Sequence, residues 1–266
     1  MTTTFLDAGF LSDEHQSKIP TMRKANSGWF SLLEDTSAIM QQTAAKASET
    51  VKGSPFDPHP LGLLVLHRAN GFFQGAILML ERGMIVEAKT LTRSALECAF
   101  VLAAVKDKPK EVRAMMIADM DAAKKGQAKA ILKTGAGSDT KALEDRIKDF
   151  GKARNISIDE LAELGVLSGM YLNYRVLSND AAHPSGKSLS RHMNKAADGK
   201  SWGGYLVGGG SDPEIAQAAD DLVLIGMAIG IAFQEMVGDT DNNARMGEVT
   251  QRLDELRRPK TAAPSE

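Results

Sequence analysis

The chain has 266 residues, of which 43% are hydrophobic, and its 32 lysines and arginines nearly balance 34 aspartates and glutamates. These values are close to the average of soluble globular proteins, so they exclude a collagen, a disordered tail and a disulfide-rich scaffold. The net charge of -2 and the pI near 6.2 give no overall attraction to nucleic acid or anionic lipid. The composition therefore does not identify a binding partner.

Helix-forming residues dominate the chain, and apolar residues recur at intervals of three and four rather than two. This pattern predicts an all-α fold: a multi-helix bundle with antiparallel helical hairpins and one glycine-rich loop or small β-hairpin. The first helical region is expected over Asp13–Val51, with a weak point at Pro20, and the breaker-rich segment Gly53–Pro60 follows it. We therefore divide the chain into an N-terminal helical arm (1–52), a linker (53–60), a helical bundle domain (61–258) and a disordered tail (259–266).

The bundle domain is predicted to begin with a helical hairpin. Helices are expected over Leu61–Arg82 and about Ile85–Lys106, and the short connection at Gly83 implies that they are antiparallel. The first helix is apolar, but four polar side chains interrupt it, and charges at the bilayer centre cost roughly 2.5–3.5 kcal/mol each. We therefore interpret it as a buried or amphipathic helix of a soluble protein and expect no membrane contact.

Polar helices are expected to follow the hairpin. One begins at Pro109 and ends near Thr134, and a second reaches Arg154, both outside the core. Ser157 and Glu160 have the spacing of a capping box, which predicts the start of a helix that continues to about residue 182.

The segment Ser185–Ser211 is rich in glycine and is expected to form a loop or a small hairpin that covers one end of the bundle. An apolar helix is expected over about Asp212–Val237, as the centre of the core. Gly226 and Gly230 lie on one side of it, where they would let a neighbouring backbone approach closely. A last amphipathic helix is expected over Thr240–Arg258.

The single cysteine, Cys98, lies in an apolar stretch, which excludes an intramolecular disulfide and a metal site built on several thiolates. The N-terminal sequence lacks the basic and apolar regions of a secretory signal, and its acidic residues argue against a transit peptide. We expect a cytoplasmic protein with no metal and no cofactor. The other histidines have no metal-binding spacing with His183: His15, His59, His67 and His192.

The first group of residues that could carry chemistry is Arg93 and Glu97, which lie one helical turn apart in the segment LTRSALECAF. Because an unpaired buried charge is costly, the two side chains must either face solvent or pair inside the bundle. They are therefore either a structural ion pair or part of a polar cluster at the centre of the bundle.

The second group lies in the segment NYRVLSNDAAHPS, where polar residues crowd the end of one helix. Asn179 and His183 are four residues apart and share a face, and Arg175 lies about two turns before His183. His183 is either a helix C-cap or a general acid/base, because histidine titrates near neutral pH. The residues that we expect to contact a ligand are Tyr174, Ser178, Asp180, Trp202 and Tyr205.

The hairpin sequence RANGFFQGAILMLERGMIVEAKTLTRSALECAFVLAAV, followed by YRVLSNDAAHPS, resembles the bacterial family known as domain of unknown function 5677. Members of that family carry an Arg-x-x-x-Glu element on a helical hairpin, and then a helix that ends in a serine- and histidine-containing motif. The resemblance covers roughly residues 60–237 and implies a helical domain with no established activity.

The same arrangement is similar to the HEPN superfamily of helical bundles, whose active members are dimeric, metal-independent ribonucleases with an Arg-x(4–6)-His motif. Ser178 stands where that superfamily has its arginine, and Arg175 lies eight residues before His183. The resemblance implies that His183 would be the acid/base, that Arg175 or Arg93 would stabilise the phosphorane, and that Glu97 would orient the arginine.

Three functions remain open from the sequence. The first is a non-catalytic module, in stress or phage defence, that binds a nucleotide, RNA or a protein. The second is a metal-independent endoribonuclease, expected to act as a homodimer, whose catalytic residues would be Arg93, Glu97, Arg175, Asn179 and His183. The third is a structural or interaction protein in which Arg93, Glu97 and His183 fix the helix register.

Overall fold

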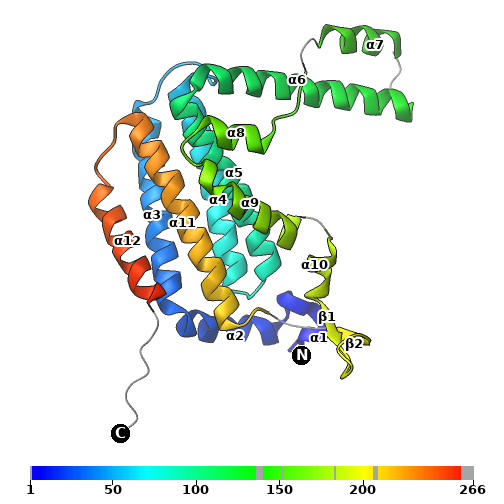
Figure 1. The fold of residues 1–266 in the computed structure, drawn as a ribbon, viewed down its shortest axis with the longest axis vertical. Coiled ribbons are helices and arrows are strands. Elements are labelled where there is room, and N and C mark those ends of the chain that lie inside the picture. Colours follow the sequence, from blue (N-terminus) through cyan, green and yellow to red (C-terminus); the bar gives the residue numbers. More distant parts are fainter. Residues whose placement is uncertain (1, 136–139, 151–152, 183, 206–208, 259–266) are drawn as a thin grey trace.

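The computed structural model describes residues 2–135, 140–150, 153–182, 184–205 and 209–258 (Figure 1). It is a helical bundle with one small antiparallel β-hairpin, which confirms the predicted fold class. Four long helices form the centre of the bundle: α3 (Ser27–Thr50), α4 (Pro58–Leu80), α5 (Ile85–Asp107) and α11 (Asp212–Val237).

Large apolar side chains from these four helices meet in one core. Phe73 of α4, Phe100 of α5 and Phe233 of α11 are fully buried there, together with Leu33 of α3. The helices α4 and α11 are long and apolar enough to cross a membrane by length and composition, and both pack against α3 and α5 in this bundle. The amphipathic helix α12 (Asn243–Arg257) packs on the outer side of α3.

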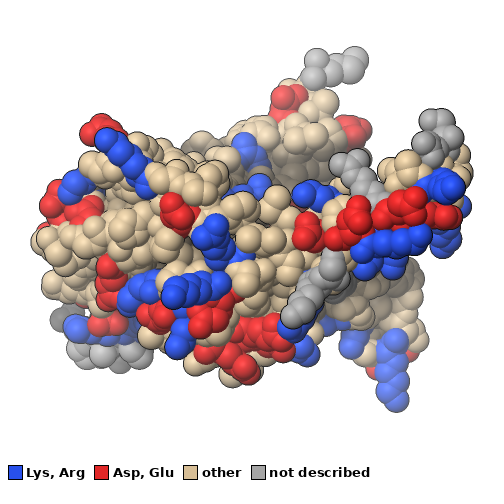
Figure 2. Space-filling model, turned by 90° about the horizontal axis from the view of Figure 1, so that it is seen from above, with Lys and Arg blue, Asp and Glu red and all other residues tan. Residues whose placement is uncertain are grey.

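A second arm, distinct from the N-terminal segment, projects from the bundle (Figure 1). It consists of α6 (Pro109–Thr134), in which Val112 is the buried residue, and the shorter α7 (Thr140–Asp149). Figure 2 shows acidic and basic side chains in neighbouring bands along this arm. The prediction that these two helices lie outside the core is confirmed except for Val112, which is fully buried in the core, and α7 ends before Arg154.

The N-terminal segment covers one end of the bundle with α1 (Phe5–Ala8), η1 (Gly9–Leu11) and α2 (Asp13–Ala25). The predicted weak point at Pro20 is wrong, because α2 continues through this proline. The break comes at Asn26, whose side-chain amide donates to the Met22 carbonyl at 3.2 Å and to Asp212 Oδ1 at 2.8 Å. A tertiary contact with the start of α11 thus sets the end of α2.

The helix predicted from Ser157 to residue 182 is divided into four pieces: α8 (Ile158–Leu164), η2 (Ser168–Met170), α9 (Tyr171–Leu177) and the π-helical turn η3 (Ser178–Ala182). The interruption follows from Gly165, which has an extended backbone. A Cβ at this position would lie 2.8 Å from the carbonyl carbon of Ala103 in α5. The backbone therefore approaches α5 too closely for any other residue.

Two local predictions in this half of the chain are also wrong. Ser157 is the N-cap of α8, but the predicted capping box does not form, since Ser157 Oγ contacts Asp159 and Glu160 pairs with Arg154. The neighbours of Gly226 are side chains rather than a backbone: an ideal Cβ would lie 2.4 Å from the ring of Phe73.

The glycine-rich segment after η3 contains a short helix that the sequence did not predict, α10 (Gly186–Ser190). The predicted small hairpin follows it, with β1 (Met193–Lys195) antiparallel to β2 (Trp202–Tyr205). Met193 pairs with Tyr205, and the register shifts between Asn194 and Lys195. The hairpin lies at the same end of the bundle as α1 (Figure 1).

Candidate functional site

A polar stripe runs along α5, which is otherwise mostly buried. Lys89, Arg93 and Glu97 are four residues apart, so they share one face of the helix. This face packs against α9 and the π-helical turn η3, which carry the second group of predicted residues. The fold thus brings together the two groups that the sequence analysis singled out.

Arg93 is the middle residue of this stripe and contacts both α9 and η3. Its Nε donates to Ser178 Oγ at 2.9 Å and its Nη2 to the Tyr174 hydroxyl at 2.7 Å, and Nη2 also lies 2.9 Å from Glu97 Oε1. The guanidinium carbon is 4.9 Å from the centre of the Tyr174 ring. Arg93 thus connects α5 to both α9 and η3 through hydrogen bonds to Tyr174 and Ser178.

The π-helical turn η3 begins at Ser178, whose hydroxyl accepts from Arg93 and donates to the Tyr174 carbonyl at 2.8 Å. Single π turns are rare and occur often at functional sites, because the extra residue changes the direction of the side chains that follow. Here the turn directs Asp180 toward the N-terminal part of α5, where it meets Lys89.

Asp180 joins two lysines from different elements. Its Oδ2 lies 2.9 Å from Lys89 Nζ of α5, and its Oδ1 pairs with Lys187 Nζ of α10. Burial would raise the pKa of this carboxyl group, but the hydrogen bonds and charges of Lys187 and Lys89 outweigh burial, so that the pKa is lowered. Asp180 is therefore ionised at neutral pH.

A third cation lies beside these lysines. Arg191 follows α10, and its Nη1 lies 2.6 Å from Glu214 Oε1 in the first turn of α11. The hydrogen bond from Arg191 is the main reason that the pKa of Glu214 is lowered to about 2, and hydrogen bonds from Ser211 also lower it. The capping box of Ser211 and Glu214 thus orients the carboxylate that holds Arg191.

These cations surround a small cavity of about 90 Å³, which we name the cationic pocket. Its charged lining residues are Lys89, Asp180, Lys187 and Arg191, so basic groups outnumber acidic groups by three to one. The volume is about three times the roughly 30 Å³ that one water molecule occupies in the liquid. The predominance of basic groups in the lining thus favours a small anionic group such as a phosphate.

A second cavity of about 290 Å³, which we name the aromatic pocket, shares Ile85, Val86 and Arg191 with the first. Its other lining residues include Phe5 and Phe10, whose rings are 5.2 Å apart. The N-terminal segment is held here because the His15 ring nitrogen Nε2 donates to the Arg82 carbonyl at 2.9 Å. Glu87 and His192 complete the polar part of the lining.

The remaining residues that the sequence singled out lie apart from Arg93. Asn179 and Arg175 are exposed, and Trp202 and Tyr205 of the hairpin are each 65% exposed. His183 lies outside the residues that the structure describes. The structure therefore brings together Arg93, Glu97, Tyr174, Ser178 and Asp180, and leaves the rest of the predicted set at the surface or undescribed.

Lys89, Lys187 and Arg191 were missed by the sequence analysis. Lys89 carried a readable signal, because it extends the spacing of Arg93 and Glu97 by one more turn along an apolar helix. Lys187 and Arg191 are also four residues apart, but they lie in a glycine- and serine-rich segment that was not predicted as a helix. Their position opposite α5 depends on the turn after η3.

Comparison with known proteins identifies a family. The model of a family of unknown function, DUF5677, matches residues 61–201. This span includes the α4–α5 hairpin, the arm, η3 and the cationic residues of α10. No curated protein and no solved structure matches the chain.

Proposed function

The chain belongs to this family of unknown function, and we propose that it is a binding module for a nucleoside phosphate, either free or as part of an RNA strand. The observation that carries the proposal is the pair of neighbouring pockets that share Arg191 in their lining. One is lined by three basic side chains, and the other is lined by aromatic rings and is large enough for a base.

The chemistry of each pocket supports this assignment. A phosphate would accept from Lys89, Lys187 and Arg191, and charge-assisted hydrogen bonds of this kind are stronger than neutral ones. A base would lie against Phe5 or Phe10, since aromatic side chains stack on any base. The carboxylate of Glu87 would accept from a base amino group or a ribose hydroxyl.

The proposal is tested by titrating the protein with adenosine monophosphate, adenosine and a single-stranded RNA of twelve nucleotides. We expect adenosine to bind about tenfold more weakly than the monophosphate, because it lacks the charged group. Lys187→Gln should weaken binding of the monophosphate to a similar extent. Lys148→Gln in α7 is the matched control, because this lysine is also exposed and also pairs with an aspartate.

Equal binding of adenosine and its monophosphate, or an unchanged affinity in Lys187→Gln, would contradict the proposal. RNA that binds more tightly than the monophosphate, with a steeper loss of affinity in salt, would identify a strand rather than a free nucleotide as the ligand.

The endoribonuclease alternative is favoured by Arg175, which is exposed and has no ion-pair partner among the described residues. It is tested by incubating the same RNA with the protein in the presence of EDTA. Cleavage that is lost in both Arg175→Gln and His183→Ala would support a metal-independent nuclease. Intact RNA, bound with the affinity of the titration, would support a non-catalytic module.

A further inference from the structure

A cavity of about 170 Å³ lies between α9 and α11 and shares no lining residue with the two pockets described above. Its walls are mainly apolar, with Leu172 and Val176 from α9 and Ile225 from α11. Leu172 is 71% exposed and Val176 is 48% exposed, so the hydrocarbon on the α9 side is open to solvent. Asp221 of α11 is the one charged residue in the described lining. The cavity thus presents a single negative charge within an apolar wall.

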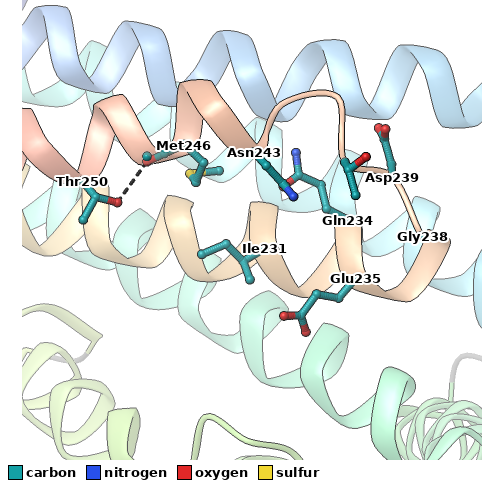
Figure 3. A pocket seen from close by; sticks show the side chains of 10 residues that line it. Ile231, Gln234, Glu235, Gly238, Asp239, Asn243, Met246 and Thr250 are labelled. Carbon is teal, nitrogen blue, oxygen red and sulfur yellow. Dashed lines mark hydrogen bonds between the residues drawn. The ribbon is translucent and has the colours of Figure 1, made fainter.

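The Asp221 carboxylate has no ion-pair partner among the residues that the structure describes. Its Oδ1 accepts one hydrogen bond, from the side-chain Nε2 of Gln217 at 3.3 Å. Figure 3 shows a different cavity, the groove between α11 and α12, whose lining carboxylates are Glu235 and Asp239. Each of these two carboxylates pairs with a lysine of another helix. Asp221 lacks this compensation, although its side chain is half-buried.

The surroundings of Asp221 favour a cation that carries an apolar group. Burial is the main reason that the pKa of Asp221 is raised, and the charge of Asp220 also raises it, whereas Gln217, Lys89 and Arg257 lower it. A cation in the cavity would offset the cost of burying the carboxylate. A bound Ca²⁺ or Mg²⁺ takes about six or more oxygen ligands, and most of this lining is hydrocarbon.

We propose that this cavity binds a primary ammonium group carried on an alkyl chain. The ammonium donates to the Asp221 carboxylate and to the side-chain oxygen of Asn173, an exposed residue that lines the cavity on the α9 side. The alkyl chain lies against Leu172, Val176 and Ile225. An alcohol with the same chain lacks the positive charge, and a fatty acid carries the wrong one. The proposal is independent of nucleotide binding beside α5.

The test compares hexylammonium with 1-hexanol and hexanoate, which have the same chain but a neutral or a negative head group. Binding is followed by protein NMR chemical shifts at neutral pH, in titrations to about 20 mM, which detect dissociation constants in the millimolar range. We expect hexylammonium to bind at least about tenfold more tightly than hexanol, and hexanoate not to bind. Adenosine monophosphate should leave the resonances of this cavity unchanged.

Three variants identify the site. Asp221→Asn keeps the shape of the side chain and removes its charge, so it should preserve the fold, weaken hexylammonium binding at least about tenfold and leave hexanol binding unchanged. Val176→Trp fills the cavity with the charge intact and should weaken the binding of both compounds. Asp254→Asn in α12 is the matched control, because Asp254 also has no ion pair within the described residues and lines none of the cavities described here.

A free alkylamine and the lysine side chain of a peptide share this chemistry, and a second probe separates them. Nα-acetyl-lysine methylamide carries the same ammonium group on a shorter chain next to two peptide groups. Tighter binding of this compound than of hexylammonium, with the same dependence on Asp221, would identify a peptide lysine as the occupant. The reverse order would identify a free alkylamine.

Each result decides the proposal. Preference for the ammonium over the alcohol, lost in Asp221→Asn and retained in Asp254→Asn, supports it. Equal binding of hexylammonium and hexanol, or an equal loss of binding in Asp221→Asn and Asp254→Asn, overturns it. Unchanged binding in Asp221→Asn, or no binding of either amine up to about 20 mM, also overturns it, and water alone then solvates this carboxylate.

Discussion

Replacing Arg93 by methionine tests whether its contacts hold the fold. Methionine keeps a stem of similar length but loses the hydrogen bonds to Ser178 and Tyr174 and the pairing with Glu97. Hydrogen bonds to charged groups are worth roughly 1.5–3 kcal/mol each, and an ion pair of this kind about 0.2–1 kcal/mol. The Arg93 side chain is 22% exposed, so water replaces part of these interactions.

Taking the low end of each range, and allowing water to reach the freed groups, gives a destabilisation of about 2 kcal/mol for Arg93→Met. With an unfolding entropy of about 2.1 cal/mol/K per residue, a chain of this length should show a Tm lower by about 4 °C. Urea unfolding and differential scanning calorimetry measure both quantities. Amides of α9 and η3 should also exchange with solvent faster, because they lose their anchor on α5.

The control for this experiment is Arg113→Met in α6, since Arg113 is exposed and makes no ion pair within the described residues. A double-mutant cycle with Tyr174→Phe should give a coupling of about 1 kcal/mol with Arg93→Met. Stability within about 0.5 kcal/mol of the wild type, with unchanged exchange in α9 and η3, would refute a structural role for Arg93.

Three further predictions follow from other contacts. Gly165→Ala should destabilise the protein by about 1–3 kcal/mol through the clash with α5, whereas Gly169→Ala, with open space around it, should be neutral in the same urea experiment. Glu214 has a pKa lowered to about 2, so its stabilising effect is present above about pH 4.5 and is lost as the pH falls toward 2. Because this side chain is 43% exposed, solvent screening leaves about 1 kcal/mol, measured as the stability difference from Glu214→Gln at pH 6 that disappears near pH 2. Burial raises the pKa of Cys98 to about 12, so a thiol reagent at pH 8 should label it only on unfolding, and rapid labelling of the native protein would contradict its burial.

The sequence alone was sufficient to predict the helices whose ends are marked by a proline or a capping residue. Pro109 begins α6, and Ser211, Pro213 and Glu214 define the start of α11. The spacing of Arg93 and Glu97 also placed both side chains on one helical face, and the ion pair that they form is one of the two arrangements that the sequence left open. In these cases the information is contained within one or two turns of the chain.

Features that depend on distant segments were not predictable in this way. Gly165 interrupts a good helical pattern because the backbone of α5 lies against it, and Asn26 ends α2 because Asp212 lies opposite. Arg93 and Ser178 are 85 residues apart in sequence, so their hydrogen bond could not be inferred from spacing. The same is true of the cationic pocket, whose basic residues come from α5 and from the segment around α10.

The polar stripe of α5 also explains why the candidate residues differ in what their substitution can show. Arg93 and Glu97 are committed to partners within the fold, so a loss of binding in Arg93→Met would be indistinguishable from a displaced η3. Lys187 is 65% exposed and touches the same Asp180 from the solvent side, so its substitution removes a charge and leaves the Arg93 contacts intact. If Lys187→Gln weakens ligand binding and leaves the stability of the protein unchanged, the ligand binds near Lys89 and Asp180. Arg93 and Glu97 then serve to stabilise the fold.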